Sequence, residues 1–166
     1  MWLVKPLRLV IEGSNLSFSS AHFLVGKDFC ETLHGHNYHV KVYVDGEPLQ
    51  GIIINFLTLK KAILEICEYY DHKFLLPTLN PLLKIEEYEN YVEIETFKGK
   101  RYVFPLEDVA KLEVEDSTCE NLAKDFCLKL VDKLKMEGEL KRGNIKAISI
   151  LIEEKPGQGV EWTLKL

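Results

Sequence analysis

The sequence has little of several features that mark special classes of protein. Its 166 residues contain six prolines and ten glycines, too few for a collagen-like or low-complexity chain. No run approaches the roughly 18 apolar residues of a membrane-spanning helix. The opening MWLVKPLRLVIEG lacks the apolar core of a secretory signal. The four cysteines form no C-x-x-C pair, so we expect a cytoplasmic protein with reduced thiols.

Basic residues are also in deficit, with 21 against 26 acidic residues and a net charge of −5. A general nucleic-acid-binding protein needs a basic face, so we expect no nucleic-acid partner. A small anionic substrate is compatible with this charge, because a local group of lysines can bind it. The 46% hydrophobic and 28% charged content is typical of a globular protein, and the length fits one domain over residues 1–166.

Hydrophobic periodicity predicts an α+β protein. Alternating apolar and polar residues indicate four main strands, at residues 7–21, 35–44, 145–152 and 160–166. Helical spacing of apolar residues indicates two helices, at residues 56–70 and 117–136. Between them, residues 82–104 are expected to form a hairpin that turns at Lys98-Gly99. Helices that cover one face of an antiparallel sheet satisfy this order.

Local signals refine these boundaries. A bulge is expected at Gly13, and Asp45-Gly46 is expected to end the second strand as a turn. Asn55 is the expected N-cap of the first helix, and Ser117-x-x-Glu120 has the form of a capping box for the second. A loop is expected over residues 25–32.

The histidines are the most informative residues, because four of the five fall within residues 22–39. His34 and His36 are two apart, so on a strand their imidazoles share one face, and Gly35 adds no side chain to the other face. His22 ends the neighbouring strand at a level where it can meet them. Three imidazoles with an open fourth position are typical of catalytic zinc; the alternative is a histidine-rich hairpin without metal. His39 has the opposite parity and is expected to point away.

Other candidates carry weaker signals. Cys30 lies four residues before His34 and is compatible with either a metal ligand or a base. The Asp71-His72 pair follows the first helix, where a histidine is also favoured by the helix dipole. Cys67 and Cys127 lie on or beside apolar helical stripes, which predicts that they are buried in the core.

Five segments together resemble one known family. They are FSSAHFL, CETLHGHNYHVKV, DHK at 71–73, STCEN at 117–121 and ILIEEKP at 150–156. In this order they resemble the 6-pyruvoyltetrahydropterin synthase / 6-carboxytetrahydropterin synthase family, over the whole chain except an insertion at about 80–113. The resemblance implies a T-fold, with a four-stranded antiparallel sheet and two helices on one face. It also implies a homo-oligomer, trimer or hexamer, with active sites between subunits.

The resemblance implies roles for individual residues. The zinc ligands would be His22, His34 and His36. Cys30 would be the catalytic cysteine, and Asp71 and His72 a proton-transfer relay. The pterin would be bound by Thr118, Glu120 and an acidic residue of the third strand. The parity of the apolar residues in that strand assigns the last role to Glu154 rather than Glu153.

The family substrate is 7,8-dihydroneopterin triphosphate. The Cys30-to-His34 spacing resembles that of the family's carboxypterin synthases. This resemblance implies a zinc-dependent lyase that makes 6-carboxy-5,6,7,8-tetrahydropterin for queuosine or archaeosine synthesis. A 6-pyruvoyltetrahydropterin product remains an alternative. Glu31 creates a further one, because E-x-x-H-G-H marks a subgroup that uses glutamate to form 6-hydroxymethyldihydropterin. An alternative of another class is a pterin- or metal-binding T-fold protein without activity. Asn55, where many members have Asp, and the insertion depart from the family pattern.

Overall fold

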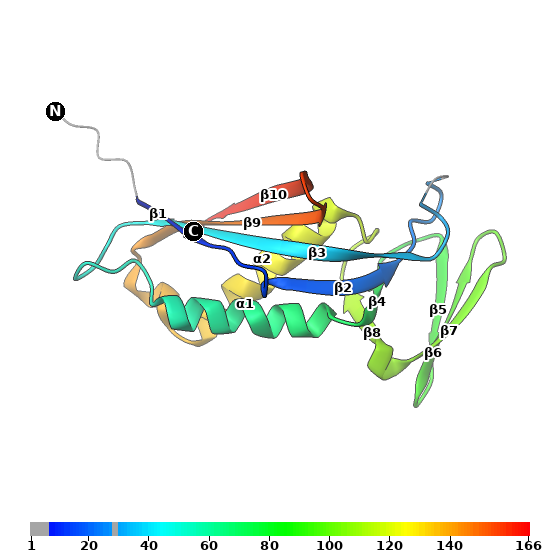
Figure 1. Cartoon of the computed structure of the whole chain (residues 1–166). Helices are drawn as coiled ribbons and strands as arrows, with labels where there is room; N and C mark the ends of the chain where they lie inside the picture. The colour runs from blue at the N-terminus through cyan, green and yellow to red at the C-terminus, as the bar shows by residue number, and fades with distance from the viewer. Residues whose placement is uncertain (1–6, 28–29) are drawn as a thin grey trace.

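The structure is a computed structural model that describes residues 7–27 and 30–166. Its strands and helices are β1 (Leu7–Ile11), β2 (Ser17–His22), β3 (His34–Gly46), α1 (Phe56–Tyr70), β4 (Lys73–Pro77), β5 (Leu83–Glu87), β6 (Tyr91–Thr96), β7 (Arg101–Pro105), β8 (Val109–Leu112), α2 (Cys119–Met136), β9 (Ile145–Lys155) and β10 (Gln158–Lys165). Figure 1 shows a main sheet lying over the two helices, with β5, β6 and β7 set at one end. The α+β class is therefore confirmed.

Two expectations from the sequence reach beyond the described residues. The opening segment examined for a secretory signal includes residues 1–6, and the loop expected over residues 25–32 includes 28 and 29; these eight positions lie outside the description. Within the described ranges, no helix has the length and apolar character needed to cross a membrane.

Strand β3 organises the main sheet. It pairs with β9 along one side, and with β1 and β2, end to end, along the other. The single strand expected over residues 7–21 is wrong. The Leu16 N–H bonds to the Gly13 carbonyl at 3.0 Å, in a turn that separates β1 from β2 rather than in a bulge. The turn expected at Asp45-Gly46 is also wrong, because β3 continues through both residues.

The two helices cover one face of this sheet, and their buried residues repeat at helical spacing. Asn55 is confirmed as the N-cap of α1, since its side chain accepts a bond from the Leu57 N–H at 2.8 Å. The capping box expected at Ser117 is wrong. Thr118 caps α2 instead, accepting from the Asn121 N–H at 3.4 Å. Cys67 and Cys127 are buried, as predicted.

The main sheet is larger than the four-stranded antiparallel sheet expected. Across the described residues its order is β10-β9-β3-β2-β4-β8, with β1 also on β3, and the β2–β4 and β4–β8 pairs are parallel. The sequence pattern missed β4 because four of its five residues are buried, which leaves no alternation to detect. Strand β8 has only four residues.

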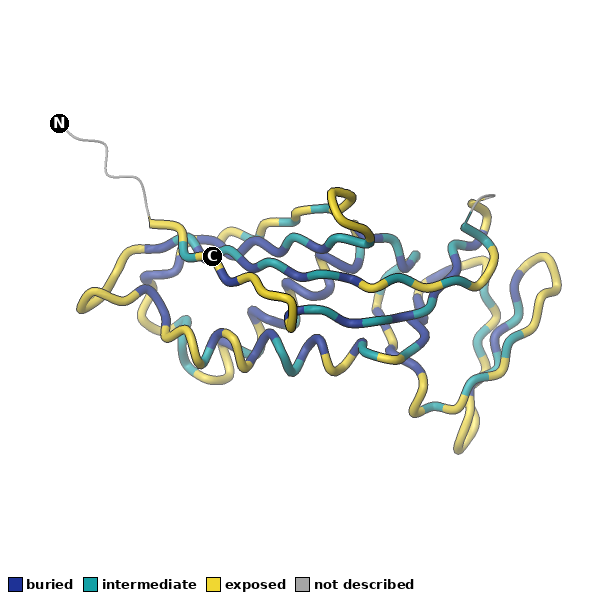
Figure 2. The backbone as a smooth tube through the Cα atoms, viewed as in Figure 1, coloured by how far each residue is buried: buried dark blue, intermediate teal, exposed yellow. Residues whose placement is uncertain are grey.

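The insertion also differs from the expected hairpin. It forms a three-stranded antiparallel sheet, β5-β6-β7, because residues 88–90 make a second turn in addition to the expected one at Gly99. Figure 2 shows buried stretches both in the main body and in this inserted sheet. A small apolar cluster joins the inserted sheet to the ends of β2 and β4; its buried members are Phe23, Val25, Phe74, Leu76, Val92, Ile94 and Val109. The inserted sheet therefore packs beside the segment that follows β2.

Candidate active site

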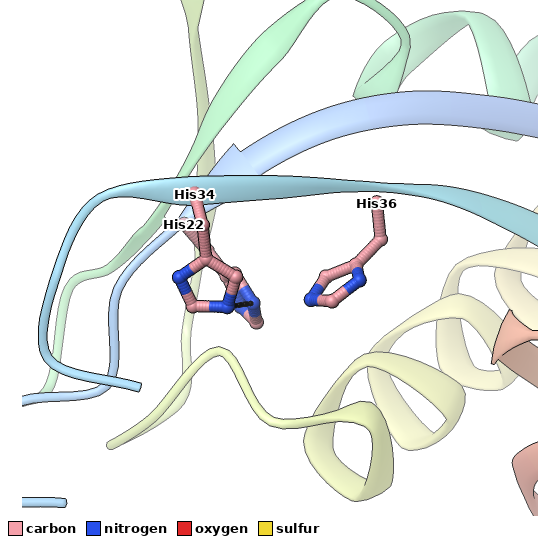
Figure 3. A group of neighbouring side chains, drawn as sticks. All are labelled: His22, His34 and His36. Carbon is pink, nitrogen blue, oxygen red and sulfur yellow. Dashed lines mark hydrogen bonds between the residues drawn. The ribbon is translucent and has the colours of Figure 1, made fainter. Parts of the chain in front are cut away.

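Three imidazoles lie together where β2 ends beside the start of β3. His22 pairs in register with His34, and the two-residue repeat of β3 places His36 on the same face. One nitrogen from each ring lies within 4.8 Å of the others, and the rings converge in Figure 3. Gly35 allows the two strands to approach, because a Cβ there would lie 2.9 Å from the Ser20 carbonyl oxygen. The sequence-predicted grouping is thus present in the structure.

Backbone carbonyls orient two of these rings. The His22 Nδ1–H donates to the Ser117 carbonyl at 2.9 Å, and the His34 Nδ1–H donates to the Thr32 carbonyl at 2.6 Å. Carbonyl oxygens only accept, so both neutral rings carry their proton on Nδ1 and a lone pair on Nε2. These Nε2 atoms lie 3.1 Å apart, and neither has a proton to give the other. Carbonyl-anchored rings with converging lone pairs are the arrangement found around metal ions.

Burial disfavours the charged form of His22 and His36. It lowers the pKa of His22 to about 4, helped by the neighbouring His34 and His36 and opposed by the Ser117 carbonyl. Burial also lowers the pKa of His36, while the charge of Glu154 acts in the opposite direction. Neutral imidazole is the form that binds metal. The donor set therefore fits a divalent ion that accepts nitrogen ligands, such as zinc.

One pocket contains most of the other predicted residues. In this pocket of ≈ 500 Å³, Cys30 lies with Thr118, Glu120 and Glu154. Glu154 reaches it because β9 alternates, so Glu153 lies on the opposite face near His39. The pocket adjoins the imidazoles, since Thr118 follows Ser117, whose carbonyl accepts a bond from His22. The structure thus brings together the predicted pterin-binding residues and the predicted catalytic cysteine.

Sequence reasoning missed Tyr38, which lies beside both groups. Its ring is fully buried and stands 5.5 Å from that of His36, and its hydroxyl has no hydrogen-bond partner among the described residues. Burial, and then the charge of Glu154, raise the pKa of this hydroxyl. The sequence did contain a signal for Tyr38, because it lies two residues after His36 and so faces the same side of the strand as His34 and His36.

Comparison with known proteins identifies the family. The model of the family described as 6-pyruvoyl tetrahydropterin synthase matches residues 14–164. The chain belongs to this family. A Methanocaldococcus jannaschii protein named "Putative 6-carboxy-5,6,7,8-tetrahydropterin synthase" is 35% identical over 148 residues, which cover 88% of each chain. The family resemblance predicted from the sequence is confirmed.

Solved structures of the family share the fold. The 6-pyruvoyl tetrahydropterin synthase of Plasmodium falciparum matches with a TM-score of 0.89 and 31% identity, over 98% of this chain and all of the other. Two structures of the Plasmodium vivax enzyme match with a TM-score of 0.89 and 27% identity, over the same shares of the two chains. In these two, a glutamate described as a catalytic residue is replaced by alanine or by cysteine. The chain is therefore an enzyme of the tetrahydropterin synthase type.

The Asp71-His72 pair of this family member is not beside the imidazoles. Asp71 follows α1 and accepts bonds from the Ser19 N–H at 2.8 Å and from His72 Nδ1–H at 2.7 Å. Burial alone would raise the pKa of Asp71, but these two bonds lower it below its usual value. The exposed His72 side chain lines a pocket of ≈ 570 Å³ with Gly35, His36 and Asn37. Asn37 has the opposite parity to His36 on β3, so its side chain lies on the face of the sheet opposite the imidazoles. Within one chain, this pair and the metal-ligand candidates are separated by the sheet.

The two adjacent base candidates also have different surroundings. Cys30 is half-buried and faces the pocket that contains Glu154. The Glu31 carboxylate instead accepts bonds from Lys98 Nζ at 2.7 Å and from the Gly26 N–H at 3.2 Å. These two partners, Lys98 first, lower the pKa of Glu31. A carboxylate with a lowered pKa is a weak base near neutral pH.

Proposed function

We propose that this chain is a zinc-dependent lyase that converts 7,8-dihydroneopterin triphosphate to 6-carboxy-5,6,7,8-tetrahydropterin, on the route to queuosine or archaeosine. The observation that carries the proposal is the imidazole cluster next to a pocket that Cys30 faces. Ser117 links the two, because its carbonyl holds His22 and the next residue, Thr118, lines the pocket. The name of the Methanocaldococcus relative supports this choice of product.

Each site residue has a specific role in the proposed reaction. Zinc, bound by His22, His34 and His36, would supply Lewis acidity that lowers the pKa of the substrate's side-chain hydroxyls. Glu154 binds the guanidine-like edge of the pterin through charge-assisted hydrogen bonds, while Thr118 and Glu120 line the same pocket. Cys30, as the thiolate, removes a proton from the substrate side chain.

The position of the Asp71-His72 pair supports an active site shared between subunits. The pair is on the opposite face of the sheet from Cys30, yet it has the form of a proton relay, with Asp71 fixing the orientation of the His72 ring. We therefore expect the pair of one chain to serve the pocket of another chain in a homo-oligomer, trimer or hexamer. His72 would transfer its proton on the side of the substrate away from Cys30.

The proposed function can be tested by identifying the reaction product. The purified protein, loaded with zinc, would be incubated with 7,8-dihydroneopterin triphosphate, and the pterin products separated and weighed by mass spectrometry. The proposal predicts 6-carboxytetrahydropterin together with acetaldehyde and triphosphate. A pyruvoyl product, or a substrate that is bound and recovered unchanged, would contradict it. Recovery unchanged would instead support a non-catalytic binding protein.

A second candidate function follows from the Plasmodium vivax structures, whose catalytic residue is a glutamate. If Glu31 acts as the base, the product is 6-hydroxymethyldihydropterin. The ion pair of Glu31 with Lys98 favours the first candidate, because it directs this carboxylate away from the pocket that Cys30 faces. The same product assay separates the two candidates.

A further inference from the structure

The Glu31 carboxylate is held at both of its oxygens. Oε1 accepts from the Gly26 N–H at 3.2 Å, and Oε2 accepts from Lys98 Nζ at 2.7 Å. The Glu31 side chain is only 15% exposed in this arrangement. Its neighbour Cys30 faces the pocket that contains Glu154. Of the two adjacent candidate bases, Cys30 therefore lies at the pocket, while the Glu31 carboxylate is bound by other partners.

A defined turn presents Lys98. This residue lies between β6 and β7, where the Gly99 N–H bonds to the Thr96 carbonyl at 2.8 Å and the Lys100 N–H bonds to Thr96 Oγ1 at 3.1 Å. Gly99 has φ +80°, a left-handed conformation that glycine adopts at little cost. The turn is thus fixed by its own hydrogen bonds, independently of the ion pair.

The inserted sheet also packs against the start of the Cys30 segment. The rings of Phe23 and Tyr102 stack with centroids 4.9 Å apart, and a Cβ placed on Gly26 would lie 3.5 Å from Leu82 Cδ1. In Figure 1 the inserted sheet stands beside the end of β2, where the connection to β3 begins. Lys98 is therefore presented by a sheet that is itself packed against this connection.

We propose that Lys98 is a positioning residue that selects Cys30 over Glu31 as the base, by holding the Glu31 carboxylate against the inserted sheet. This inference rests on the proposed function and assigns a role to the insertion. Among the described residues, Glu31 without Lys98 keeps its bond to Gly26, and its carboxylate then samples orientations toward the substrate. Reaction through Glu31 then competes with reaction through Cys30.

The competing reaction is a simple carbon–carbon cleavage. Glu31 takes the proton of the C2′ hydroxyl of the substrate, and the C1′–C2′ bond breaks. Its electron pair passes to C1′, which is conjugated with the pterin ring and is then protonated. The products are 6-hydroxymethyldihydropterin and glycolaldehyde triphosphate. The atoms and electrons balance without an oxidant, a reductant or added water.

The test measures the ratio of hydroxymethyl to carboxy product by mass spectrometry. A partly exposed ion pair shifts a conformational equilibrium by a few-fold, so Lys98→Ala should raise this ratio about two- to fivefold. Lys98→Arg, which keeps the charge, should restore the wild-type ratio. Lys84→Ala is the matched control, because Lys84 pairs with Glu86 inside the inserted sheet, and it should leave the ratio unchanged.

The double variant Glu31→Gln/Lys98→Ala decides whether the effect passes through Glu31. The inference predicts that its ratio returns to the wild-type value. An unchanged ratio in Lys98→Ala, or a raised ratio that persists in the double variant, would overturn it. If the wild-type enzyme forms no carboxypterin, the proposed function fails; if it forms carboxypterin and Lys98→Ala matches it, only this inference fails.

Discussion

The two faces of the main sheet carry different chemistry on the same strands. Strand β3 directs His34 and His36 toward the helix-covered face and His39 to the other. Strand β9 does the same with Glu154 and Glu153. The comparison shows that the alternation of side chains along a strand separates candidate site residues from residues of the same type on the opposite face. It also provides matched controls, His39 for His34 and Glu153 for Glu154.

Removing a ligand on the helix-covered face should have the largest effect. His34→Ala should lose bound zinc and activity together, since two imidazoles hold the ion much more weakly than three. His39→Ala, on the other face, should retain both. Elemental analysis of the purified variants measures the metal content. Stoichiometric zinc in His34→Ala would show that the ion binds elsewhere.

The proton relay on the opposite face gives the next largest effect. His72→Ala should lower kcat by about 10²–10⁴-fold with zinc retained, the usual loss for a positioned proton-transfer group. If the two faces meet between subunits, mixing His34→Ala with His72→Ala chains should recover activity, because some mixed sites contain both residues. Native mass spectrometry would verify that the subunits exchange. Exchange without recovered activity would refute a shared site.

Substitutions of the two glutamates of β9 should have smaller effects, and these should differ in KM. Glu154→Gln should raise KM about 10- to 100-fold, because hydrogen bonds to a charged carboxylate are lost at the pterin edge. Glu153 accepts a bond from the Gly157 N–H and lies near Lys41 on the other face, so Glu153→Gln should change KM less than twofold. Steady-state kinetics on both variants measures the difference, and equal effects would place the pterin edge elsewhere.

Thiol labelling of the unmodified sequence tests whether Cys30 differs from the three buried cysteines. Burial raises the pKa of Cys67 and Cys119 to about 12 and that of Cys127 to about 11, so these thiols should resist alkylation in the native protein near neutral pH. Cys30 is only half-buried, whereas the other three thiols are buried, so Cys30 should react first. Peptide mapping after brief iodoacetamide treatment would identify the labelled residue. Early labelling of Cys67 or Cys127 would contradict their burial.

Much of the site was predictable because it depends on local periodicity. The imidazole grouping follows from residues two apart on one strand and a histidine at the end of the next. The parity of β9 favoured Glu154 over Glu153 for the same reason. Helix α1 and its Asn55 cap were predictable from spacing and one side-chain oxygen.

The remainder depends on contacts between distant segments. Strands β4 and β8 pair in parallel with partners that no local pattern specifies, and the turn at 88–90 divides what reads as one hairpin. The carbonyl of Ser117 orients a histidine 95 positions earlier, so the residue expected to cap α2 supports the imidazole cluster instead. Lys98 and Glu31 are 67 positions apart, and no spacing rule joins them.

The choice between Cys30 and Glu31 tests the central claim most directly. Product formation would be measured for Cys30→Ala and Glu31→Gln, each loaded with zinc to the wild-type level. Cys30 faces the pocket that contains Glu154, whereas the Glu31 carboxylate is paired with Lys98. Cys30→Ala should therefore lower kcat for carboxypterin by about 10²–10⁴-fold, while Glu31→Gln stays within a few-fold of wild type. The reverse result, an inactive Glu31→Gln and an active Cys30→Ala, would contradict the account and assign the chain to hydroxymethylpterin formation.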